Sequence, residues 1–156
     1  MTESDLKSRL QSGLTDAIRS RDEVRAATLR MALTAVRSEE VAGKAARTLS
    51  DDEVVGVLSR EAKKRRESVE AYRGAGRQEL ADRESAELTV LEGYLPAQLS
   101  DEEIATIVTE AVAQARVAGA EGPKAMGQVM KLVQPRTKGR ADGGRVSAEV
   151  RRQLAG

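Results

Sequence analysis

Apolar residues recur at helical spacing along almost the whole chain, and no stretch shows the alternation of a half-buried β-strand. A first helix carries one stripe of apolar residues with polar residues around it, formed by Leu6, Leu10, Leu14 and Ile18. A second helix opens near Asp22 and has two apolar faces, one with Val24, Ala27, Met31 and Ala35 and the other with Leu29, Leu33 and Val36. A helix with apolar residues on two faces is expected to be contacted from both sides, so we expect the second helix to be central. The pattern predicts an all-α fold.

Two capping boxes mark further helix starts, at Ser50 with Glu53 and at Ser100 with Glu103. The third helix, beginning at Ser50, should end near Gly74 and Gly76, since glycine relieves the steric cost of a left-handed terminal residue. Its predicted inner face consists of Val54, Leu58, Ala62, Val69 and Tyr72. A fourth helix runs to about Tyr94, with a stripe of Leu80, Leu88, Leu91 and Leu95.

Pro96 marks the best domain boundary, because proline disfavours helical conformation in the preceding residue and donates no amide hydrogen bond. We expect about four helices in residues 1–96 and three in residues 97–156. The fifth helix should end at Gly119, and the sixth should begin at Pro123 and end at Pro135. Asp142 is a candidate cap for the seventh.

Composition excludes most familiar catalytic sites. Among 156 residues there is no histidine and no cysteine, which removes zinc fingers, Ser-His-Asp triads, thiolate nucleophiles and iron-sulfur clusters. The sequence also lacks a phosphate-binding loop of the G-x-x-x-x-G-K-[ST] type. We therefore expect no cofactor and no metal, and independent catalysis is disfavoured, with only Ser, Thr, Lys and carboxylates available as reactive groups.

No apolar run approaches the length of a membrane-spanning helix, and the first five residues are too polar for a signal peptide. The sequence thus predicts a cytoplasmic protein without a membrane partner. Two tyrosines, no phenylalanine and no tryptophan also leave few aromatic platforms for stacking single-stranded nucleic acid.

The net charge of +1 conceals a strong partition along the chain. Residues 58–77 hold seven basic and three acidic residues, whereas residues 78–110 hold one basic and nine acidic residues. Residues 131–156 are basic again, with seven basic residues against two acidic ones. Segments of opposite net charge within one chain suit docking to a charged partner.

Two basic segments are candidate contacts for phosphate. Arg136, Lys138 and Arg140 lie on a predicted glycine-bearing loop before a helix N-terminus, where guanidinium groups and backbone amides can meet one phosphate. A flexible solvated turn is the alternative. The run Lys63, Lys64, Arg65 and Arg66 is a weaker candidate, because it also fits a solvated helix face paired with nearby glutamates.

The chain resembles the GatB/YqeY family, which includes stand-alone YqeY-like proteins. Any one matching segment is a weak signal, but their order and spacing over essentially the whole length are specific. The segments are TLRM at 28–31, LSDDEV at 49–54, KKRRES at 63–68, LEGYLPAQLS at 91–100, MGQVM at 126–130 and KGRADG at 138–143.

The resemblance implies an N-terminal helical domain and a C-terminal domain similar to the tail of the B subunit of the glutamine-dependent tRNA amidotransferase. In that enzyme the tail helps to grip the outer elbow of tRNA and does not contain the amide-transfer active site. The positions that the resemblance implicates in RNA binding are Lys124, Gln128, Lys131, Arg136, Lys138 and Arg140. The family label of carbon-nitrogen ligase activity with glutamine as amide donor has no physical support in these residues.

The leading hypothesis is a non-catalytic module that binds tRNA or other structured RNA through backbone shape and charge. A protein-interaction adaptor, docking an aminoacyl-tRNA synthetase or another translation protein, is the alternative. A helix-turn-helix DNA reader is less favoured, because the predicted connection from 134 to 142 exceeds the usual turn of three or four residues.

Overall fold

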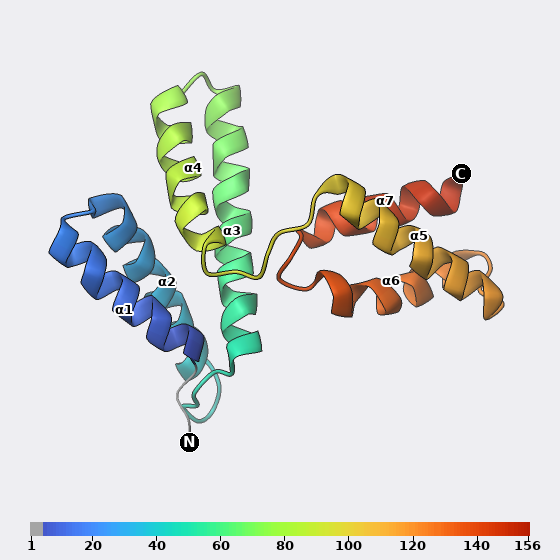
Figure 1. Cartoon of the computed structure of the whole chain (residues 1–156), viewed down its shortest axis with the longest axis horizontal. Helices are drawn as coiled ribbons and strands as arrows, with labels where there is room; N and C mark the ends of the chain where they lie inside the picture. Colours follow the sequence, from blue (N-terminus) through green and yellow to red (C-terminus); the bar gives the residue numbers. More distant parts are fainter. Residues whose placement is uncertain (1–4) are drawn as a thin grey trace. The chain divides into compact units, whose positions relative to one another are not determined.

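The computed structural model describes residues 5–156, which form seven α-helices and no β-strand (Figure 1). The predicted all-α class is therefore confirmed. The helices are α1 (Asp5–Ser20), α2 (Glu23–Val41), α3 (Asp51–Gly74), α4 (Gln78–Glu92), α5 (Asp101–Val117), α6 (Pro123–Thr137) and α7 (Gly143–Ala155). The chain divides into two compact units, with the boundary between Pro96 and Ala97. Within residues 5–156, every helix is too short or too polar to cross a bilayer.

Side-chain caps start several of these helices. Both predicted capping boxes are formed: Ser50 Oγ accepts from the Glu53 amide at 3.2 Å, and Ser100 Oγ accepts from the Glu103 amide at 3.1 Å. The two glutamates accept in return from the serine amides, and these hydrogen bonds hold the pKa of each carboxyl below its usual value. Asp142 caps α7 as predicted.

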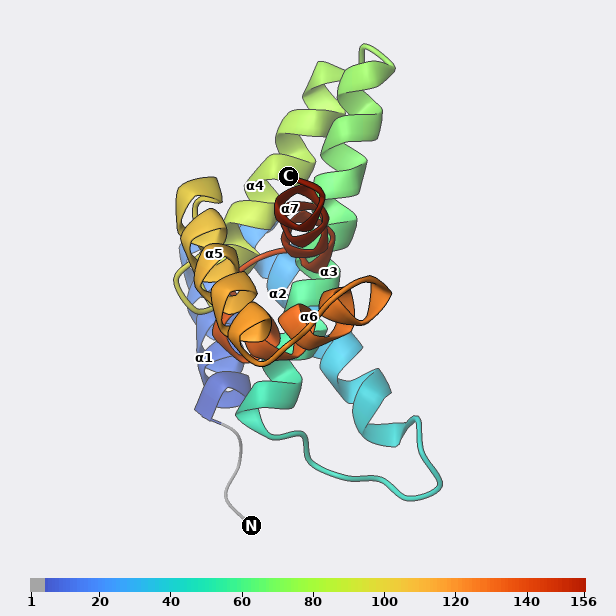
Figure 2. The same cartoon turned by 90° about the vertical axis from the view of Figure 1, so that its right-hand side faces the viewer.

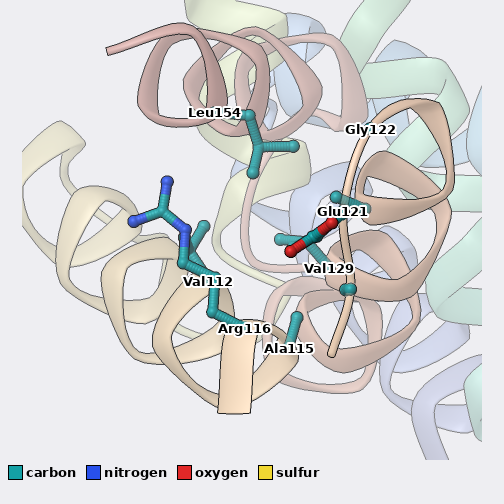
Figure 3. A pocket seen from close by; sticks show the side chains of 9 residues that line it. Val112, Ala115, Arg116, Glu121, Gly122, Val129 and Leu154 are labelled. Atoms are coloured by element: carbon teal, nitrogen blue, oxygen red, sulfur yellow. The ribbon is translucent and has the colours of Figure 1, made fainter. Parts of the chain in front are cut away.

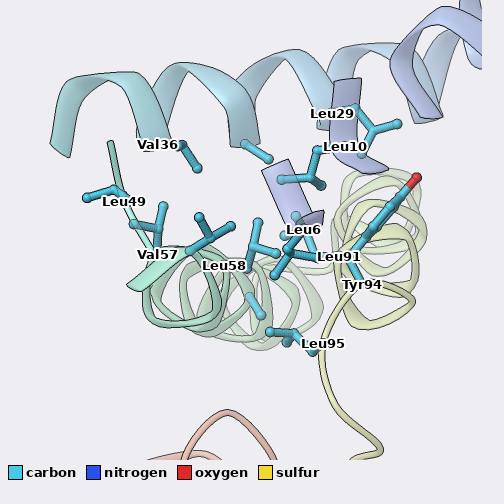
Figure 4. Packing of buried hydrophobic residues seen from close by; sticks show 13 residues of the cluster. Leu6, Leu10, Leu29, Val36, Leu49, Val57, Leu58, Leu91, Tyr94 and Leu95 are labelled. Atoms are coloured by element: carbon cyan, nitrogen blue, oxygen red, sulfur yellow. The ribbon is translucent and has the colours of Figure 1, made fainter. Parts of the chain in front are cut away.

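The core of the first unit is aliphatic and is shared by four helices (Figure 4). Leu10 of α1 and Leu29 of α2 meet Leu58 of α3 and Leu91 of α4, and all four side chains are fully buried. Helix α3 packs along α4 as a hairpin, and α2 contacts α1, α3 and α4. The predicted central position of the second helix is thus confirmed.

Three residues that the apolar pattern placed on inner stripes are exposed: Ile18 by 50%, Met31 by 46% and Leu80 by 39%. Met31 follows the buried Leu29 by two residues, about 200° around the helix, and so lies on the opposite face. Ile18 and Leu80 lie in the last turn of α1 and the first turn of α4. Periodicity identified the stripes but not how far along each helix the packing continues.

Tyr94 belongs to this core, and its side chain occupies space that a residue larger than glycine at position 13 would need. A Cβ atom on Gly13 of α1 would lie only 2.1 Å from Tyr94 Oη, so no larger residue fits without movement. Arg25 Nη2 donates to Tyr94 Oη at 3.1 Å. The guanidinium carbons of Arg9 and Arg25 lie 5.5 Å and 5.7 Å from the ring centroid, which adds cation-π attraction.

A buried charge cluster joins α3 to α4. Arg65 is 7% exposed, and its Nε atom lies 3.0 Å from Glu87 Oε2 and 3.5 Å from Glu84 Oε2. Glu84 Oε2 makes no hydrogen bond within residues 5–156. Burial, with the neighbouring charge of Glu87, raises the pKa of Glu84 despite the attraction of Arg65. Arg65 thus neutralises Glu87 better than it neutralises Glu84.

Helices α5, α6 and α7 form the second unit, and each contacts the other two (Figures 1 and 2). Val108 of α5, Val129 and Val133 of α6 and Val150 of α7 are fully buried in its core. The beginning of the unit is tied to the turn between α6 and α7, where the Leu99 amide donates to the Arg140 carbonyl at 2.7 Å.

The prediction that Pro135 ends the sixth helix is wrong, since α6 continues to Thr137. Proline removes the amide that would bond to the carbonyl of Lys131. Both residues are exposed, so that carbonyl lies on the solvent side of the helix and can be hydrated. The Lys138 amide still donates to the Gln134 carbonyl and closes the last turn. Five residues, 138–142, then connect α6 to α7.

We predict that Gly13→Ala destabilises the protein by about 1–3 kcal/mol, because the added methyl group collides with Tyr94 Oη. Thermal or urea unfolding measures the loss. Tyr94→Phe removes the colliding oxygen, so the double variant should be less destabilised than the sum of the two single variants. Simple additivity of the two losses would contradict this packing.

We predict that Glu84→Gln raises the melting temperature at pH 7. The raised pKa of Glu84 means that its ionised form is disfavoured in the folded state, so a neutral isostere removes an unfavourable charge. The advantage should shrink as the pH falls through the folded-state pKa of Glu84 and vanish below its usual value of 4.5, where the wild-type carboxyl is protonated in both states.

Glu40→Gln is the matched control with the opposite sign. A hydrogen bond from Lys7 Nζ, 2.9 Å from Glu40 Oε1, lowers the pKa of Glu40, so its charge stabilises the fold above pH 4.5. This control should melt at a lower temperature than the wild type at pH 7. Equal shifts in the two variants would refute the assignment of Glu84.

Candidate nucleic-acid interface

One exposed face of α6 carries three of the residues predicted to bind RNA, and a fourth follows directly after the helix. Lys124, Gln128 and Lys131 are spaced by four and three residues, which places their side chains on one side of the helix. Pro135 lies on the same side and is also exposed. Lys138 is the first residue after α6; its backbone is no longer helical, and it is exposed. We call these five residues the α6 stripe.

The three lysines of the stripe are not neutralised within the described part of the chain. The ion pairs found in the second unit use arginines: Arg136 with Glu110, Arg145 with Asp101 and Arg152 with Glu149. No ion pair joins Lys124, Lys131 or Lys138 to a carboxylate of residues 5–156. Their ammonium groups therefore remain available to an external anion.

Arg136 and Arg140 lie elsewhere. Arg136 is rotated about 120° from Lys124 around α6, and its Nη1 atom lies 2.6 Å from Glu110 Oε2 of α5. Arg140 Nε donates to the Ala97 carbonyl at 3.2 Å. Both arginines line a hollow of about 380 Å³ together with Glu102 and Glu103. The structure thus separates these two cations from the stripe and engages them within the unit.

The weaker candidate segment on α3 does not form one surface either. Lys63 and Lys64 are exposed and Arg66 is half-buried, while Arg65 turns toward α4 and is buried against Glu87. Lys64 Nζ also pairs with Glu61 Oε2 at 2.9 Å. These four cations are adjacent in the sequence, but adjacent residues of a helix point about 100° apart, so they do not share one face. Arg65 joins α3 to α4 and is not part of an exposed patch.

A separate hollow of about 590 Å³ lies between α5, α6 and the end of α7 (Figure 3). Arg116 and Glu121 supply the charged groups of its lining, and Val112, Val129 and Leu154 supply apolar groups. The lining residues include no hydroxyl group. Within residues 5–156, no group of three or more carboxylates is placed to hold a metal ion.

Comparison with known proteins places the chain in a family. The model of the family described as YqeY-like proteins matches residues 7–154. The chain belongs to the YqeY-like family. One similar protein is the Altered inheritance of mitochondria protein 41, mitochondrial, of Pyrenophora tritici-repentis, which is 32% identical over 139 residues, covering 85% of this chain and 71% of that protein.

A second relative is an uncharacterized protein of Schizosaccharomyces pombe, 31% identical over 98 residues, which cover 62% of this chain and 77% of the relative. Family membership agrees with the resemblance drawn from the sequence segments.

One residue of the site was misplaced from the sequence, namely Arg136, which lies in α6 and not on the loop that follows. Because the helix was predicted to end at Pro135, Arg136 was assigned to a loop with Lys138 and Arg140. Lys138 and Arg140 do lie in the connection between α6 and α7.

Proposed function

We propose that this YqeY-like protein binds structured RNA, with tRNA as the first candidate, through the α6 stripe. The observation that carries the proposal is a group of three exposed lysines, two on one face of α6 and one directly after it, without ion-pair partners in residues 5–156. Phosphate contacts from such a surface need no aromatic stacking, which suits a chain with two tyrosines as its only aromatic residues. The resemblance of residues 97–156 to the tail of the tRNA amidotransferase B subunit supports tRNA over other RNAs.

The proposed role is binding without amide transfer. Resemblance extends to the tail of the amidotransferase subunit, which lies outside its active site, and the chain has no histidine or cysteine for nucleophilic chemistry. A role beside translation in the cytoplasm is part of the proposal. The mitochondrial name belongs to the relative from Pyrenophora tritici-repentis.

We predict that changing Lys124, Lys131 and Lys138 together to Ala weakens tRNA binding and lowers the slope of log affinity against log salt concentration by about three, roughly one per phosphate contact. Fluorescence anisotropy of end-labelled tRNA at several salt concentrations measures both quantities. Because these side chains are exposed and form no ion pair within residues 5–156, the melting temperature should change little.

The matched control replaces Arg19, Lys44 and Arg73 by Ala, which removes the same charge from exposed positions of the first unit. It should retain most of the affinity. Equal losses in the two triple variants would show that net charge, and not the α6 stripe, determines binding. Competition with an RNA duplex and a DNA duplex completes the test. Preference for the DNA duplex would favour a helix-turn-helix reader. The connection of five residues between α6 and α7 is close in length to the turn of that motif.

A groove in the first unit supports a second candidate, the protein-interaction adaptor. It has a volume of about 510 Å³ and lies between α2 and α3, with the exposed Met31 in its lining. Arg30, Arg60 and Glu39 supply charges around this apolar residue. An apolar centre with a charged rim is the usual composition of a protein-docking surface. The proposed partner class is an aminoacyl-tRNA synthetase or another translation protein.

The adaptor candidate predicts that a partner captured from a lysate survives nuclease treatment and is lost with Met31→Lys, because a charge placed in the groove must be desolvated on docking. Affinity purification followed by mass spectrometry measures both results. Loss of all captured proteins after nuclease treatment would favour the RNA-binding candidate.

A further inference from the structure

Gly127 occupies an unusual position in the middle of α6. It is exposed, it has no left-handed backbone angle, and a Cβ atom built on it would meet no atom within 4 Å. Glycine within a helix is less stable than alanine, because it loses more backbone freedom on folding. Neither the packing nor the backbone geometry of the described chain therefore requires glycine here.

The surroundings of Gly127 connect it to the α6 stripe. Lys124 precedes it by three residues and Lys131 follows it by four, so both side chains flank it on the helix surface. These two lysines lie about 10 Å apart along the helix axis. Between them the missing side chain leaves the helix backbone bare, beside the exposed amide of Gln128.

We propose that a strand of the bound RNA crosses α6 at Gly127, with a ribose against the bare helix backbone and neighbouring phosphates on Lys124 and Lys131. This inference rests on the proposed RNA-binding function. The glycine permits close approach, which lets both lysines reach phosphates of one strand. Gln128 offers both a donor and an acceptor, as does the ribose 2′-hydroxyl group, so this pair distinguishes RNA from DNA.

The test compares the wild type with Gly127→Ala and with Gly56→Ala as a matched control. Gly56 lies within α3, where a Cβ atom would make an ordinary contact at 3.8 Å with Arg60 Nη1. Both substitutions should raise the melting temperature by a few degrees, since each replaces a helical glycine. Only Gly127→Ala should weaken the binding of labelled tRNA, by about tenfold or more, because its methyl group occupies the space of the ribose.

The possible results separate this inference from the function on which it rests. Absence of saturable tRNA binding by the wild type overturns the proposed function. Wild-type binding together with unchanged affinity in Gly127→Ala overturns the close approach alone. A lower melting temperature in Gly127→Ala also overturns it, because the glycine would then serve the fold.

Gln128→Leu tests the ribose contact separately, since it keeps the size of the side chain and removes its amide. The ratio of affinities for an RNA duplex and a DNA duplex of the same sequence should fall, with the DNA affinity unchanged. An unchanged ratio overturns the assignment of Gln128 to the 2′-hydroxyl group.

Discussion

The packing of Val129 and Val133 against α5 and α7 fixes the rotation of α6, and the character of the candidate interface depends on that rotation. Both valines are fully buried in the core of the second unit. Because a helix turns about 100° per residue, burying this pair exposes Lys124, Gln128 and Lys131 on the other side. The aliphatic core thus determines which polar groups face a partner.

Ion pairing within the protein also determines which cationic side chains are available to a partner. Arginine has a planar group with several donors, which suits it to structural pairs with carboxylates and carbonyls. Arg136 and Arg140 follow this rule, holding Glu110 and the Ala97 carbonyl, and Arg65 does so inside the first unit with Glu87. The α6 lysines have no such partner in residues 5–156. Net charge along a segment is therefore a poor guide to the charge that a partner meets.

The division between arginines that form structural contacts and lysines that remain available also changes the shape of the proposed RNA-binding surface. A loop holding three cations around one phosphate resembles an anion pocket, whereas exposed lysines along α6 and directly after it suit the proposed contact with a phosphate backbone. Contacts to backbone phosphates position a protein by shape and carry no direct information on base sequence. The α6 stripe also leaves the backbone at Gly127 uncovered, which a pocket built on the loop would not use.

The sequence by itself determined the helices and most of their ends, because capping boxes at Ser50 and Ser100 and apolar spacing act over a few residues. It also identified the residue types of the candidate site. Tertiary structure decided which cations are exposed: Arg65 is buried against Glu87, a residue 22 positions away, and Arg136 pairs with Glu110 on another helix. It also carried α6 past Pro135, since the carbonyl left without a partner faces solvent. These outcomes depend on which helix faces pack together. Caps and apolar spacing act within one helix and contain no information on the pairing of helices.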